Sequence, residues 1–76
     1  MNSLELKAER IRRGYTCDDM GKLLGLKSGD TYRKKEKGVT MFSPEQIAKI
    51  AVEFELPPDR TSLIFFDGKL PIGQSE

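Results

Sequence analysis

The side chains best suited to chemistry gather in one short stretch of the chain. Residues 27–38 carry five basic and two acidic side chains, a local net charge of +3, whereas the whole chain of 76 residues has a net charge of only +1. Clustered lysine and arginine are the usual means of binding phosphate groups, so this stretch predicts a contact with nucleic acid. The alternative for such a run is a solvated helix face with no ligand.

The rest of the composition argues against catalysis. The chain has no histidine and a single cysteine, Cys17. An internal disulfide, a zinc site of the histidine and cysteine kind, and a Cys–His or Ser–His nucleophile are therefore excluded. The seven glycines are scattered and form no phosphate-binding loop. We expect a protein that is not an enzyme and that uses no cofactor, metal or small-molecule substrate.

The size of the chain predicts one small domain with one thin core. Hydrophobic residues make up 37% and charged residues 33%, which is ordinary for a globular protein. The longest apolar run, Leu63 to Phe66, is too short to span a membrane, and the first residues lack the apolar stretch of a secretory signal. We therefore expect a cytoplasmic protein without a membrane partner.

Capping residues and glycines predict an all-α chain of five short helices. We expect these helices at about residues 4–13, 17–24, 29–37, 44–55 and 58–65. In the first, the spacing of Leu4, Ala8 and Ile11 predicts a buried apolar stripe. The fourth has the clearest start, because Ser43 and Gln46 match a capping box.

The second and third helices have the properties of a helix-turn-helix. Gly21 is small enough for two helices to cross closely, Gly25 suits the turn between them, and Tyr32 can anchor the inner side of the third helix. The outer side of that helix is basic, with Arg33, Lys34 and Lys37. The order of these features predicts that the third helix packs against the rest of the domain and presents its basic side chains to a ligand.

Residues 4–66 resemble the lambda-repressor-like helix-turn-helix family, also called the Cro or Xre family. The matching segments are Leu6-Lys7-Ala8-Glu9-Arg10, Gly14-Tyr15-Thr16, Met20-Gly21-Lys22-Leu23-Leu24-Gly25-Leu26, Thr31-Tyr32-Arg33-Lys34-Lys35-Glu36-Lys37-Gly38, Phe42-Ser43, Ile47-Ala48-Lys49-Ile50-Ala51 and Leu63-Ile64-Phe65-Phe66. The resemblance implies a compact five-helix DNA-binding domain over residues 1–66, followed by a C-terminal tail at 67–76. The chain is also similar to short regulators from phages and prophages of Gram-positive bacteria.

The function that this resemblance implies is sequence-specific transcriptional regulation, as a phage-type repressor with its third helix in the major groove of an operator. The implied partners are double-stranded DNA and a second copy of the chain in a weak homodimer. We expect the pairing surface at residues 63–66, with Leu70 and Ile72, unless the two phenylalanines of this segment cap the monomer's own core. The alternative function is a protein-interaction module of the same fold, antirepressor or antitoxin-like, which the near-neutral net charge favours.

The residues expected at the DNA contact lie in and around the third helix. They are Lys27, Ser28, Gly29, Asp30, Thr31, Arg33, Lys34 and Lys37. Gly29 and Asp30 fall nearest to the positions where family members read bases. Asp30 could accept a hydrogen bond from cytosine N4, or it could only stabilise the first turn of the helix. Ser28 and Thr31 are candidate phosphate donors, although capping alone explains Ser28.

Three further residues are interpreted through the family pattern. The resemblance implies a partly buried, bidentate ion pair between Arg10 and Glu36, which would fix the third helix against the first. Cys17 stands where family members often carry a glutamine that contacts phosphate, so the chain departs from the family pattern at this position. Lys35 stands where relatives often have a large inner residue, and we expect its alkyl stem to pack inward.

Overall fold

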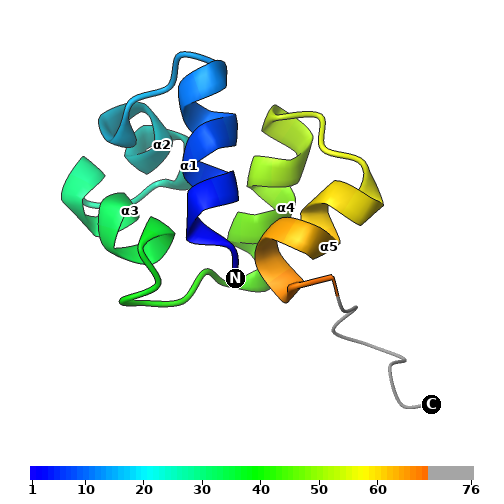
Figure 1. The fold of residues 1–76 in the computed structure, drawn as a ribbon. Helices are drawn as coiled ribbons and strands as arrows, with labels where there is room; N and C mark the ends of the chain where they lie inside the picture. The colour runs from blue at the N-terminus through cyan, green and yellow to red at the C-terminus, as the bar shows by residue number, and fades with distance from the viewer. Residues whose placement is uncertain (69–76) are drawn as a thin grey trace.

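The computed structural model describes residues 1–68, and in this part of the chain all regular structure is helical (Figure 1). The five helices are α1 (Ser3–Arg12), α2 (Cys17–Leu24), α3 (Gly29–Glu36), α4 (Pro44–Glu53) and α5 (Pro58–Phe66). The all-α, five-helix prediction is therefore confirmed for these residues. The ends of α1, α3 and α4 fall one or two residues before the expected ones.

Side-chain caps explain where the helices α1 to α4 begin. Thr16 and Asp19 form a reciprocal capping box at the start of α2, and Ser43 and Gln46 form another at the start of α4. Each box satisfies backbone N–H groups that have no partner inside the helix. At the end of α2, Gly25 adopts φ +70°, a left-handed conformation that costs glycine little.

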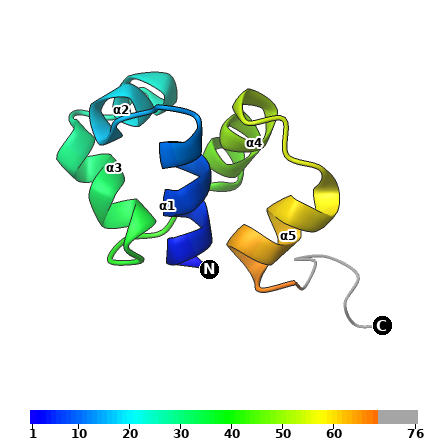
Figure 2. The same cartoon turned by 45° about the horizontal axis from the view of Figure 1, so that its top comes forward.

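Helix α1 lies between two pairs of helices, with α2 and α3 on one side and α4 and α5 on the other (Figures 1 and 2). One hydrophobic core joins all five helices, and its fully buried side chains are Leu6, Met20, Tyr32, Ile50, Phe54 and Ile64. Phe42 connects the two halves, because its ring lies 5.9 Å from that of Tyr32 and 5.6 Å from that of Phe65. The core therefore holds α3 in a fixed position relative to α1 and α5.

The prediction of a buried apolar stripe along the first helix is wrong. Leu4 and Ile11 are 81% and 56% exposed, whereas α1 buries Leu6, Glu9 and Arg10. The physical reason is that two of the three buried side chains are charged and find ion-pair partners on other helices. Apolar spacing therefore marks the wrong face of this helix.

The prediction of a pairing surface at residues 63–66 is corrected in part. Ile64 and Phe65 are buried in the monomer's own core, so they do not form an exposed pairing surface. Leu63 remains 41% exposed and Phe66 is half-buried. Leu70 and Ile72 lie outside the described residues. None of the helices within residues 1–68 has the length and apolar character needed to cross a membrane.

Candidate nucleic-acid interface

Two glycines allow α2 and α3 to cross closely. A Cβ at Gly21 would lie 2.9 Å from the carbonyl oxygen of Ser28, and a Cβ at Gly29 would lie 2.8 Å from the backbone nitrogen of Asp18. Ordinary Cβ atoms do not approach so closely, so both positions need glycine. The role of Gly21 agrees with the sequence prediction. Gly29 is buried at the crossing, so packing against α2 explains this glycine, and its contact with DNA stays a prediction.

An ion pair fixes the inner side of α3. The Arg10 guanidinium donates from Nε and Nη2 to the two carboxylate oxygens of Glu36, at 2.8 and 3.2 Å, and both side chains are at most 10% exposed. Arg10 also donates to the carbonyl oxygen of Tyr15 at 2.9 Å. The bidentate pair that the resemblance implied is therefore present, and it ties α3 to α1 and to the loop before α2.

Tyr32 completes this buried polar group. Its hydroxyl donates to the Glu36 carboxylate at 2.9 Å, and its ring belongs to the core. Burial, together with the neighbouring Glu36 carboxylate, raises the pKa of Tyr32, and hydrogen bonding to Glu36 raises the pKa of Arg10. In residues 1–68 no buried side-chain nitrogen or oxygen lacks a hydrogen-bond partner. The buried polar groups on the inner face of α3 thus find their hydrogen-bond partners within the protein.

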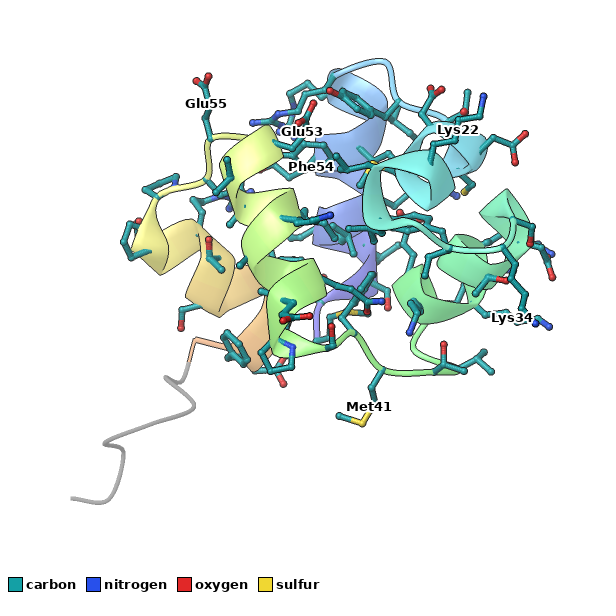
Figure 3. All side chains as sticks on the ribbon, turned by 180° about the vertical axis from the view of Figure 1, so that it is seen from behind. Lys22, Lys34, Met41, Glu53, Phe54 and Glu55 are labelled. Atoms are coloured by element: carbon teal, nitrogen blue, oxygen red, sulfur yellow. The ribbon has the colours of Figure 1, made fainter. Side chains whose placement is uncertain are left out.

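The outer face of α3 is exposed and carries charge. Arg33 and Lys34 are about half exposed, with side-chain exposures of 52% and 57%, and Lys37 and Lys27 are exposed as well. Lys34 points away from the body of the molecule (Figure 3). Asp30 lies among them and accepts a hydrogen bond from Arg33 at 2.6 Å, with the Lys34 ammonium 3.6 Å from its other oxygen. The hydrogen bond from Arg33 lowers the pKa of the Asp30 carboxyl.

Ser28 and Thr31 lie at the start of α3. The Ser28 side-chain oxygen accepts a hydrogen bond from the backbone N–H of Thr31 at 3.2 Å, and the two hydroxyl oxygens are also 3.2 Å apart. Ser28 is exposed and Thr31 half-buried. The capping interpretation of Ser28 is therefore confirmed, and its contact with phosphate stays a prediction.

Tertiary structure adds two lysines that the sequence analysis did not select. A depression of about 260 Å³ lies between α1 and α3, and Lys7 lines it together with Arg33, Lys37 and Cys17. A second depression of about 230 Å³, lined in part by Lys22 and Lys27, adjoins the turn before α3. Lys7 carries no sequence signal because it is far from residues 27–38 along the chain, and only the packing of α1 against α3 brings it there.

Sequence analysis also missed a cluster of charges around Glu9. This buried carboxylate pairs with Arg12 and Arg13 of its own chain segment and with Arg60 of α5. Burial opposes its ionisation, but hydrogen bonds from Arg60 and Arg13 outweigh that effect and lower the pKa of Glu9. The spacing to Arg12 and Arg13 is a recognisable helical signal, whereas the contact with Arg60 has none. The cluster joins α1 to α5 and is structural.

An apolar groove of about 880 Å³ lies at the end of the molecule where the α3–α4 loop meets α5. Its apolar lining includes Met41, Phe42, Ile47 and Phe66, and Met41 is 86% exposed (Figure 3). Lys35 is half-buried and donates to the Met41 carbonyl oxygen at 2.7 Å, and the inward packing of its stem stays a prediction. This groove is an apolar feature of the described surface that could meet another protein.

Comparisons with known proteins do not identify the chain. A scan of family models finds no match, and neither does a search of curated proteins or of solved structures. The family resemblance therefore rests on the motif residues, and it stays a prediction. Among residues 1–68 there is also no group of three or more histidine, cysteine or acidic side chains that could hold a metal ion.

Proposed function

We propose that this protein is a sequence-specific, DNA-binding transcriptional regulator of the lambda-repressor-like kind, a cytoplasmic phage-type repressor. The observation that carries the proposal is the two-sided character of α3. One side is locked to the body through Glu36 and Tyr32, and the opposite side presents exposed Arg33 and Lys34. A rigid helix with a basic outer face is what major-groove reading requires.

The dimensions of α3 support this placement. An α-helix with its side chains is about 10–12 Å across, so α3 can fit into the DNA major groove, which is about 12 Å wide. Lys7 and Lys22 lie in the depressions beside α3, where a DNA backbone would run if the helix entered the groove. In this arrangement α3 contacts bases, and the flanking lysines contact phosphates.

We further propose that the protein binds a two-fold operator as a weak homodimer. A single small module buries only about 600–1,000 Å² of protein surface on DNA, which is modest for specificity. Two modules double these contacts. With Phe65 buried, we place the pairing surface at the groove beside Phe66 and Met41. Sedimentation at several concentrations, with and without operator duplex, tests the dimer, and a strict one-to-one complex with a two-site duplex would contradict it.

Charge reversal on α3 tests whether this helix makes the proposed contacts with the operator. A duplex is first obtained by in vitro selection of bound sequences. Reversing Arg33 and Lys34 together to glutamate should weaken its binding by about 2–4 kcal/mol and flatten the salt dependence. The matched single variants are Lys34→Glu and Lys49→Glu, because Lys49 is an exposed helical lysine on α4.

Of the two single variants, only Lys34→Glu should bind the selected duplex more weakly, and the slope of its salt dependence should be smaller by about one. Both single variants should keep the wild-type circular dichroism spectrum. Normal operator binding by the double variant would show that α3 does not make the contacts that recognise the operator.

A second candidate function is a protein-interaction module, antirepressor or antitoxin-like, without specific DNA binding. The apolar groove at Met41 and Phe66 and the net charge of +1 favour it. An electrophoretic shift with mixed genomic DNA at low salt separates the two functions. Absence of any shift would favour the interaction module.

A further inference from the structure

We propose that Asp30 is a specificity-determining residue that restrains the two cations of α3 from binding DNA of arbitrary sequence. This inference rests on the proposed function. It starts from an arrangement at the most exposed part of α3, where one carboxylate serves two cations. Asp30 accepts from Arg33 at 2.6 Å and lies 3.6 Å from the Lys34 ammonium.

The pairs follow from helical spacing. Arg33 lies three residues after Asp30 and Lys34 lies four residues after it, so all three side chains share one face of the helix. All three are more than half exposed, so the pairs are weak and a phosphate can replace the carboxylate. The cations are therefore available to DNA, but each contact requires Asp30 to give up a partner.

The fate of the released carboxylate depends on the base sequence. In the major groove an aspartate can accept a hydrogen bond from the amino group of cytosine or of adenine, whereas guanine N7 and O6 and thymine O4 offer only further acceptors. At a matching base the carboxylate gains a donor as Arg33 and Lys34 turn to the DNA. At a non-matching base it is left facing acceptors and phosphates, which disfavours the complex.

Asp30 thus lowers affinity everywhere except at sites that offer it a donor. Net charge alone does not produce this effect, since an acidic residue elsewhere on the surface changes operator and random DNA affinities together. The distinguishing property is direct contact between the carboxylate and the cations that bind phosphate. Within the described residues, Asp30 is the acidic side chain that pairs with Arg33 and Lys34.

The test compares Asp30→Asn with Asp59→Asn. Both aspartates are exposed and occupy the second position of a helix, in α3 and α5 respectively, and Asp59 forms no ion pair among residues 1–68. Both variants remove the same charge and the same interaction with a helix N-terminus. Fluorescence anisotropy measures binding of each protein to a selected duplex and to a random-sequence duplex at several salt concentrations.

The Asp30→Asn protein should bind the random duplex about three- to tenfold more tightly, with a salt slope steeper by about one, and should lose a similar factor in discrimination. The Asp59→Asn protein should keep the wild-type discrimination between the two duplexes, because losing this charge changes both affinities together. If both variants discriminate as the wild type does, Asp30 has no such role while DNA binding stands. If none of the three proteins binds either duplex at low salt, the proposed function fails, and this inference fails with it.

Discussion

Replacing Arg10 by alanine should destabilise this protein far more than replacing Arg12. Arg10 makes two hydrogen bonds to Glu36 and one to the Tyr15 carbonyl, in a site where its own side chain is 10% exposed and that of Glu36 is 6% exposed. Alanine at position 10 leaves the Glu36 carboxylate buried, with the Tyr32 hydroxyl as its remaining protein partner.

The size of the effect follows from the burial. Removing one partner of a buried ion pair costs about 3–5 kcal/mol, because the other charge stays uncompensated. The total stability expected for a domain of this size is only about 4–11 kcal/mol. The Arg10→Ala protein should therefore lose a large part of its stability. Arg12 is 61% exposed, and its partner Glu9 keeps Arg13 and Arg60, so Arg12→Ala should change stability by about 0.5 kcal/mol at most.

Urea unfolding followed by far-UV circular dichroism measures both variants. With a slope of about 1 kcal/mol per molar, the midpoint of Arg10→Ala should fall by about 3 M or more, whereas that of Arg12→Ala should stay close to wild type. Replacing Arg10 and Glu36 together by methionine removes the stranded charge, so this double variant should recover much of the loss. Equal midpoints for the two single variants would refute the reasoning.

Two further predictions concern packing and pH. Gly29→Ala should destabilise the protein by about 1–3 kcal/mol in urea unfolding, because the new Cβ would meet the backbone of Asp18. Helix propensity alone predicts the opposite, so an increase in stability would contradict the close crossing of α2 and α3. Glu9 has a lowered pKa, so its contribution is present above the unfolded value of about 4.5 and is lost as pH falls through the folded value. The unfolding free energy of Glu9→Gln should therefore vary less below pH 4.5 than that of wild type, and identical pH profiles would exclude this role.

The local features of the fold were predictable from the order of the residues. Capping boxes at Thr16 and Ser43 and the glycine turn at Gly25 lie within a few residues of the backbone groups they satisfy, so their chemistry is readable from spacing. Gly21 was also recognisable, because close helix crossing in a short helix-turn-helix needs a residue without a side chain. The pairing of Arg10 with Glu36, distant in the chain, was available only through the family resemblance.

Which faces are buried and which charges meet depends on how the five helices pack. Leu4 and Ile11 point to solvent while Glu9 is buried, because α1 lies between α3 and α5 and its charged side chains find partners there. Lys7 reaches the face of α3 for the same reason. Burial and long-range ion pairing depend on how whole helices pack, and neither residue type nor helical period encodes that arrangement.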